Sequence, residues 1–175
     1  KRDIPFFRIR EPGGSINSEK IRKLILHKNS NFNRNTDLLL YLASRSENMI
    51  LLKKFYNKKI ILIDRFIDST IAYQHYGLGV ELALIKSINK SILSNFKISF
   101  TFLNLVNHKN MLKRLKARNF LNRYDNFDKN FYTKVQNGFI KLSKKNAAKY
   151  QIVDSNLDIK INENLIINKI IKLIK

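Results

Sequence analysis

The chain has 175 residues, of which 44% are hydrophobic and none is cysteine. This length can bury the core of one domain, and the missing thiols exclude disulfides, thiolate metal sites and cysteine nucleophiles. No apolar run approaches the length of a membrane span, and the first residues lack a signal-peptide pattern, so we expect a cytoplasmic protein without a membrane partner. The formal charge is +21. Clustered cations indicate nucleic-acid binding, but lysines spread over the whole chain also fit a compositional habit.

The first predicted elements are a strand and a helix joined by a glycine-rich turn. Residues 4–9 predict the strand, which runs into the sequence REPGGS at Arg10–Ser15. Pro12 fixes its own φ, and the two glycines after it permit a tight turn. Ser15 or Ser18 can cap the helix that follows. The turn is either a plain connection between strand and helix, or it holds the cation Arg10 at the strand end beside a backbone that a ligand can approach closely.

A long helix comes next, after a polar loop. Thr36 is the predicted N-cap, and the helix ends near residue 56. Tyr41 and Arg45 lie one turn apart on this helix and therefore share a face. Such a pair can stack on a base and reach a phosphate, or it can be a core aromatic with a partly buried cation. The pattern alone leaves both interpretations open.

The central stretch is IILIDRFIDSTIAYQ. Ile60–Ile63 predict a short strand buried on both faces, followed directly by Asp64 and Arg65 and then by a helix over 66–75. In parallel α/β sheets, ligands bind at the carboxyl ends of the strands, so an acid and a base at this junction face a possible site. The alternative is a capping Asp64 and a solvated Arg65.

The rest of the chain continues the alternation of strands and helices. The pattern predicts a helix over 80–94, a strand over 98–105, a helix over 107–118, a helix over 128–148 capped by Asp128, a strand over 151–154 and a helix over 159–174. We therefore expect one α/β domain over 1–175, a three-layer fold in which helices cover both faces of a parallel sheet.

The polar residues at the strand ends and on the neighbouring helix faces describe a site for a small phosphorylated base. Arginine binds phosphate bidentately, and a glutamine side chain offers the paired donor and acceptor that a pyrimidine edge requires. The candidate residues are Arg10, Tyr41, Arg45, Asp64, Arg65, Thr70, Tyr73, Gln74, Arg114, Arg118 and Arg123.

Four motifs together resemble the thymidylate kinase family: REPGGS at 10–15, YLASR at 41–45, DRFIDSTIAYQ at 64–74 and RLKARNFLNRYD at 114–125. They occur in the family's order and spacing across nearly the whole chain. The resemblance implies a P-loop NTPase-like nucleoside monophosphate kinase. Such an enzyme transfers the γ-phosphoryl group of ATP to dTMP with Mg²⁺, giving dTDP for dTTP biosynthesis. It also implies a homodimer, for which the long helix over 36–56 is a possible face.

The resemblance assigns roles to the acceptor-site residues. Arg65 would hold the dTMP phosphate with help from Arg10, and Asp64 would lie near the magnesium ion. Tyr41 would stack on thymine, where the family usually has Phe, and Arg45 would reach the base and phosphate region. The remaining assigned contacts are Thr70 and Gln74 with the thymine edge, Tyr73 with the deoxyribose and Pro12 with the sugar.

The resemblance also predicts a lid over about 114–127. Its arginines, Arg114, Arg118 and Arg123, would stabilise charge on the transferred phosphoryl group by electrostatics and positioning. Asn122 departs from the family, which more often has Asp before this last arginine, and puts the local lid geometry in question.

A second departure is the absence of a GxxxxGK[ST] sequence, the loop that cradles ATP phosphates. We expect a fragment that lacks about 30 N-terminal residues, the size of one strand–loop–helix unit. It should be inactive alone, with an unfilled slot between the strands at 60 and 98. Two alternatives remain: a basic nucleic-acid-binding module, and a related deoxynucleoside kinase.

Overall fold

The structure, a computed structural model, describes residues 4–118 and 122–174. These residues form two compact units. The first contains residues 4–97 and 122–139, and the second contains 98–118 and 140–174. The expected single domain over 1–175 remains a prediction.

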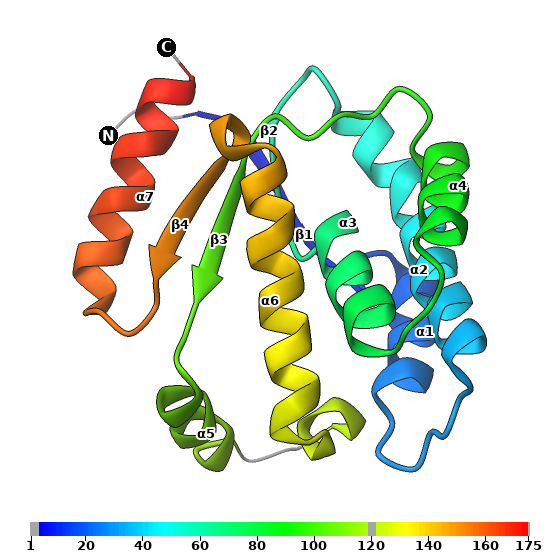
Figure 1. Cartoon of the computed structure of the whole chain (residues 1–175). Coiled ribbons are helices and arrows are strands. Elements are labelled where there is room, and N and C mark those ends of the chain that lie inside the picture. Colours follow the sequence, from blue (N-terminus) through cyan, green and yellow to red (C-terminus); the bar gives the residue numbers. More distant parts are fainter. Residues whose placement is uncertain (1–3, 119–121, 175) are drawn as a thin grey trace. The chain divides into compact units, whose positions relative to one another are not determined.

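The order of elements follows the predicted alternation, with short π and 3₁₀ segments added (Figure 1). The first unit holds β1 (Phe6–Arg10), α1 (Ile16–Leu26), α2 (Arg34–Phe55), β2 (Ile60–Asp64), α3 (Ile67–Thr70), the π-helix η1 (Ile71–Gly77), α4 (Leu82–Leu93), the 3₁₀ helix η2 (Arg123–Asn126) and most of α6 (Lys129–Lys145). The second holds β3 (Thr101–Leu105), α5 (His108–Lys116), the end of α6, the 3₁₀ helix η3 (Ala147–Lys149), β4 (Tyr150–Asp154) and α7 (Ile159–Leu173).

The strands pair in parallel, as the sequence predicts. β1 pairs with β2, and the register places Arg10 opposite Asp64. β3 pairs with β4 in the same sense, from Thr101 opposite Tyr150 onward. The described strands form two separate two-stranded sheets, and no ladder joins β2 to β3. The first register matters most for function, because it brings two predicted site residues to one sheet edge.

The prediction that Ile60–Ile63 is buried on both faces is wrong. Leu62 is 41% exposed, whereas Ile61 and Ile63 pack with Ile9 and Met49 in an apolar cluster. Successive side chains of a strand point to opposite faces, so this run buries one face only. An all-aliphatic sequence hides the alternation that would have revealed this.

The N-caps explain where the helices begin. Ser15 caps α1 by accepting a hydrogen bond from the Ser18 amide at 3.2 Å. The cap of α2 is Asn33 and not Thr36, because the Asn33 side chain accepts from the amides of two following residues at 3.0 Å. Asp128 accepts from the Phe131 amide at 2.7 Å at the start of α6, as predicted.

The helix predicted over 66–75 continues to Gly77 as α3 and the π-helix η1. The Leu78 amide donates to the Tyr73 carbonyl five residues earlier at 3.0 Å, which is the π pattern. This wider turn carries Tyr73 and Gln74. Apolar periodicity does not predict this π-helix.

The first unit contains two apolar clusters. One is built from Ile25, Ala72, Tyr124, Phe131 and Val135, which come from α1, η1, η2 and α6. Because this cluster joins elements from both segments of the unit, it fixes η2 against the first helices. No helix in the described part of the chain is long and apolar enough to cross a membrane.

Candidate active site

The turn between β1 and α1 is held by side chains from α1 and α2. Gly13 and Gly14 have φ angles of 110° and 115°, a region that favours glycine. The Gly13 amide donates to the hydroxyls of Ser18 and Ser44 at 3.1 and 3.2 Å. Its carbonyl accepts from the Asn48 amide group at 2.7 Å. These hydrogen bonds hold the turn in one conformation at the carboxyl end of β1.

Three arginines gather near this turn. Arg10 is exposed and pairs with Glu19 at 3.1 Å, and Arg22 donates to the carbonyl of the buried Pro12 at 2.6 Å. The pKa of Arg22 is lowered, first by its burial and then by the positive charges of Arg10 and Arg65. Neighbouring guanidinium groups that repel one another favour a bound anion. Arg22 was not among the predicted site residues, since a lone basic residue on an amphipathic helix is usually a solvated side chain.

Asp64 and Arg65 follow β2 directly, as predicted. Arg65 has a φ of 62°, which non-glycine residues rarely adopt and which costs of the order of 1–3 kcal/mol. Its guanidinium lies 5.2 Å from the centre of the Tyr73 ring. Desolvation lowers the pKa of Arg65, but the neighbouring Tyr73, Tyr41 and Asp64 outweigh it and raise that pKa. Arg65 is thus a permanent cation on a strained backbone.

Three tyrosines form a cluster beside Arg65. The Tyr124 ring meets Tyr41 and Tyr73 edge-on, with centroid distances of 6.2 and 5.7 Å. Burial raises the pKa of Tyr41 to about 12 and also raises the pKa of Tyr124. Both hydroxyls therefore stay protonated at neutral pH and can donate hydrogen bonds. The structure brings the predicted stacking residue, Tyr41, and the predicted sugar contact, Tyr73, into one aromatic cluster.

Arg45 lies at the centre of a buried polar network and is only 1% exposed. Its Nε donates to Glu11 at 2.8 Å, Nη1 to Asn89 at 2.6 Å and Nη2 to Thr70 at 2.9 Å. The guanidinium also lies 4.7 Å from the centre of the Phe66 ring. Burial raises the pKa of Glu11, and the positive charge of Arg45 opposes this. Each nitrogen of the guanidinium thus has a partner within the protein.

Thr70 and Gln74 are both buried, one helical turn apart. The Thr70 hydroxyl accepts from Arg45, so it belongs to the network just described. The Gln74 Nε2 donates to Asp37 Oδ2 at 3.1 Å and approaches the Tyr124 hydroxyl at 3.4 Å. Its Oε1 is buried and has no hydrogen-bond partner among the described residues. Gln74 therefore presents a free carbonyl oxygen inside the protein.

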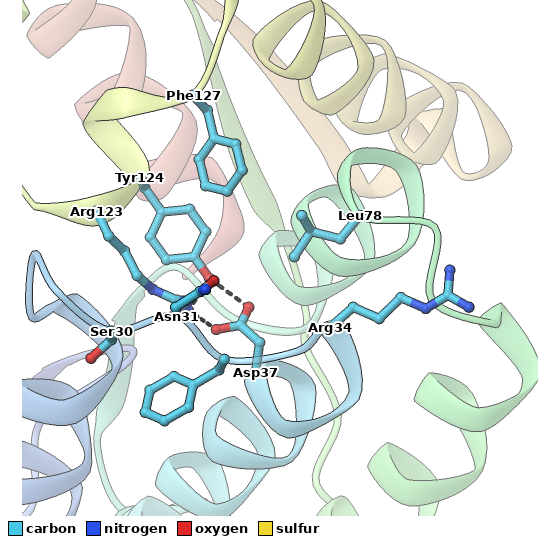
Figure 2. A pocket seen from close by; sticks show the side chains of 9 residues that line it. Ser30, Asn31, Arg34, Asp37, Leu78, Arg123, Tyr124 and Phe127 are labelled. Atoms are coloured by element: carbon cyan, nitrogen blue, oxygen red, sulfur yellow. Dashed lines mark hydrogen bonds and ion pairs between the residues drawn. The ribbon is translucent and has the colours of Figure 1, made fainter.

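A cavity of ≈ 280 Å³ lies on the other side of Asp37, between the start of α2 and η2. Figure 2 shows Arg123 and Tyr124 pointing from η2 toward the Asp37 carboxylate, whereas Arg34 extends away from it. Asp37 Oδ1 pairs with Arg123, and the Tyr124 hydroxyl donates to Oδ2 at 2.6 Å. The Arg123 Nε donates to the Ile25 carbonyl at 2.6 Å. Asp37 was not among the predicted site residues, because its partners lie far away in the chain.

Arg123 is engaged on several sides, which bears on its predicted catalytic role. Besides Asp37 and Ile25, its guanidinium packs on the rings of Phe32 and Tyr124 at 5.5 and 4.7 Å. A guanidinium held in this way anchors η2 to α1 and α2. The contact with a transferring phosphoryl group remains a prediction that this arrangement does not favour.

Asn122, which departs from the family pattern, caps η2. Its side-chain amide donates to Asp125 Oδ2 at 2.7 Å, and its own backbone amide donates to the same oxygen at 2.9 Å. The Asn122 Oδ1 accepts from the Tyr124 amide at 2.9 Å. Aspartate at this position would place a second carboxylate against Asp125. The substitution therefore suits the local geometry.

Two arginines of the predicted lid, Arg114 and Arg118, lie in the second unit. Arg114 donates to the Ser155 carbonyl at 2.6 Å. Arg118 lies beyond α5, which ends at Lys116 and is shorter than predicted. Residues 119–121 of the predicted lid lie outside the described residues. The roles of both arginines remain predictions.

The donor set suits a magnesium ion that is held mainly by a substrate. In the described ranges, no group of three or more His, Cys, Asp or Glu side chains could hold a metal ion by itself. Asp64 is an exposed carboxylate at the end of β2. Mg²⁺ usually keeps several waters and binds one or two carboxylates together with substrate phosphates. A single carboxylate beside an anion site fits this mode of binding.

Comparison with known proteins decides the family. The family model for thymidylate kinase matches residues 1–166. The thymidylate kinase of Wolbachia pipientis wMel is 37% identical over 164 residues, which cover 93% of this chain and 80% of that protein. The chain belongs to the thymidylate kinase family. The Mycoplasma capricolum thymidylate kinase is 35% identical over 170 residues, covering 94% and 78% of the two chains.

A solved structure supports the same thymidylate kinase assignment. The crystal structure of thymidylate kinase from Ehrlichia chaffeensis aligns with a TM-score of 0.71 and 29% identity, covering 95% of this chain and 80% of that chain. The expected α/β fold of the P-loop NTPase type is confirmed. Phosphotransfer to dTMP is the activity that the comparisons favour over a nucleic-acid-binding module or a deoxynucleoside kinase.

Proposed function

We propose that this chain binds dTMP with its first unit and takes part in ATP-dependent phosphorylation to dTDP. The observation that carries the proposal is the grouping of Arg65, Arg22 and Arg10 beside Tyr41 and Tyr73. A group of arginines next to a group of aromatic rings suits a nucleoside monophosphate. The arginines match its anionic phosphate, and the rings match its flat base.

Each acceptor contact follows from the chemistry of its residue. Arg65, in a conformation fixed by the backbone, binds the phosphate with charge-assisted hydrogen bonds, and Arg10 and Arg22 add positive potential. The Tyr41 ring offers a flat face for thymine, and Tyr73, which packs against Arg65, borders the deoxyribose. Pro12 borders the sugar from the opposite turn.

Arg45 acts mainly by positioning within this proposal. Because its nitrogens already bind Glu11, Asn89 and Thr70, it connects the β1 turn, α4 and the end of α3. Thr70 is held by the same contact. Gln74, with its free carbonyl oxygen, is the better candidate for a direct hydrogen bond to the thymine edge.

ATP and Mg²⁺ complete the proposed reaction. Bound magnesium would neutralise charge on the transferring phosphates, and Asp64 is the residue that would help hold it. Asp64 lies opposite Arg10 in the strand register, so acid and base share the edge at which the phosphates would meet. Arg114 and Arg118 are the proposed lid cations, whereas we assign a positioning role to Arg123.

We also propose a cytoplasmic homodimer. The outer face of α2 exposes two large aliphatic side chains, Leu39 at 55% and Ile50 at 71%. Burying such side chains against a second copy would remove apolar area from water. The absence of a membrane-spanning helix from the described residues is consistent with this location.

Equilibrium binding of dTMP tests the acceptor site. Arg65→Ala should weaken dTMP binding by about 10- to 150-fold, since a hydrogen bond to a charged group contributes about 1.5–3 kcal/mol. Isothermal titration calorimetry measures the change. Arg8→Ala removes an exposed arginine from the same pair of strands and should leave the affinity unchanged. Equal affinities for the Arg65 variant and the unaltered chain would remove the proposed phosphate contact.

A further inference from the structure

Asp37 and Gln74 form a buried pair that determines which end of the glutamine amide is free. A carboxylate only accepts hydrogen bonds, so the side of Gln74 that faces Asp37 must be its NH₂ group. The 3.1 Å contact between Gln74 Nε2 and Asp37 Oδ2 has this arrangement. The Tyr124 hydroxyl donates to the same oxygen at 2.6 Å and can in turn accept from Nε2. Both neighbours therefore hold the amide in one orientation.

Asp37 is itself held in place. Its other oxygen pairs with Arg123 (Figure 2). The Arg123 guanidinium is in turn fixed by the Ile25 carbonyl. The Asp37 side chain is 1% exposed, and its Oδ2 accepts from the Tyr124 hydroxyl at 2.6 Å. The oxygen that faces Gln74 is therefore already acting as a hydrogen-bond acceptor.

The consequence is a free carbonyl oxygen on the opposite side of the amide. Gln74 Oε1 is buried without a hydrogen-bond partner among the described residues, which is unfavourable when no donor arrives. The amide adjoins Tyr124, whose ring contacts Tyr41 and Tyr73, the proposed base and sugar contacts. A hydrogen-bond donor on a bound base would satisfy this acceptor.

We propose that Asp37 is a specificity-determining positioning residue: by orienting the Gln74 amide, it selects pyrimidine bases whose ring N3 carries a hydrogen. Thymine and uracil have this N–H, whereas N3 of cytosine is an acceptor and would face another acceptor. The inference rests on the proposed dTMP site and deepens it. It concerns base selection, so it makes no demand on the phosphoryl-transfer step.

Asp37→Asn tests the orientation directly. Arg123 requires an acceptor, so it holds the carbonyl of the new amide and turns the NH₂ group toward Gln74. The Gln74 amide then inverts and presents its own NH₂ group to the base. We expect the ratio of dissociation constants for dCMP and dTMP, measured by calorimetry, to fall by about 10-fold or more, one net hydrogen bond being about 1 kcal/mol and an acceptor clash more.

The ligand dUMP provides a matched control. It carries the same N3–H as dTMP, so the ratio of dUMP to dTMP affinities should not change in the Asp37→Asn variant. A merely structural loss would weaken all three nucleotides together and leave both ratios unchanged. Unchanged ratios in a folded variant overturn the proposal.

A second variant covers failure of the first to fold. Asp37→Asn with Arg123→Gln removes both charges, so no unpaired ion is left buried. It frees the Gln74 amide to adopt either orientation, and the preference for dTMP over dCMP should shrink. Retention of the full preference by this double variant also overturns the proposal. If the unaltered chain binds dTMP no better than dCMP, the thymine specificity of the proposed function itself fails.

Discussion

Burial changes what an individual arginine can do. Arg65 is exposed at a strand end, with its backbone at a φ of 62°. Arg45, from the middle of α2, has its charge matched by Glu11 within 2.8 Å and is hidden from water. Both were predicted to contact the nucleotide. Only the first has a geometry that leaves its guanidinium available.

The buried pair gives a prediction about stability. Arg45→Ala should lower the free energy of unfolding by about 3–5 kcal/mol, because it leaves the Glu11 carboxylate buried without its cation. Urea denaturation followed by circular dichroism measures the change. Lys53→Ala, an exposed change in the same helix, should stay within about 0.5 kcal/mol of the unaltered chain.

The double variant Arg45→Met with Glu11→Gln separates lost packing from an unpaired charge. Removing both charges should recover a large part of the loss, since the penalty comes from the ion left behind. A double variant as unstable as Arg45→Ala would show that Arg45 stabilises the protein through its other contacts.

Some site residues could be predicted from their neighbours in the sequence, and others could not. Asp64 and Arg65 follow a strand with no turn between them, and the junction lies where predicted. Arg22 and Asp37 gave no signal, because a lone basic residue and a first-turn acid are ordinary helix residues. Their importance comes from partners, Arg65 and Arg123, that only the folded chain brings near.

At the scale of elements, the close contact between η1 and α6 depends on two glycines. A Cβ added at Gly138 in α6 would lie 2.5 Å from the Tyr76 ring in η1, and one at Gly77 would lie 2.6 Å from the Phe131 ring. Glycine at these two positions allows the π-helix and α6 to approach closely. The π-helix, which carries site residues, thus packs directly against α6.

Gly138→Ala should therefore destabilise the protein although alanine favours helices. We expect a loss of about 1–3 kcal/mol in the free energy of unfolding from overpacking, against a gain of about 1 kcal/mol from propensity. Asn137→Ala, exposed and next in the same helix, should be neutral or slightly stabilising. Thermal unfolding of the three proteins would contradict this explanation if both variants raised the melting temperature.

Element types could be predicted better than their interiors. Apolar periodicity located the strands and helices to within a few residues, as for the closing helix predicted over 159–174 and found at Ile159–Leu173. The cap of α2 was placed three residues late, because both Asn33 and Thr36 are good caps. The π-helix was not predicted, since one inserted residue does not disturb the apolar pattern enough to be seen.

The whole molecule carries a charge of +21, and this predicts two different salt responses. Any binding to duplex DNA should be non-specific and fall by about 10³-fold or more between 50 and 200 mM salt. Binding of dTMP engages few charges at close range and should weaken by about 10-fold or less. Fluorescence anisotropy with a labelled duplex, and calorimetry with dTMP, measure the two. Salt-resistant DNA binding without dTMP binding would favour the nucleic-acid alternative.

The turn at Gly13–Gly14 has a consequence for how this chain can change over generations. Connecting segments usually drift faster than the helices they join. Here the backbone of the turn uses Ser44 and Asn48 of α2 as hydrogen-bond partners. A mutation in the turn must preserve hydrogen bonds to a helix more than two dozen positions away. Changes in the turn are therefore tied to changes in the helix. The connection between β1 and α1 thereby becomes one of the most slowly drifting parts of the site.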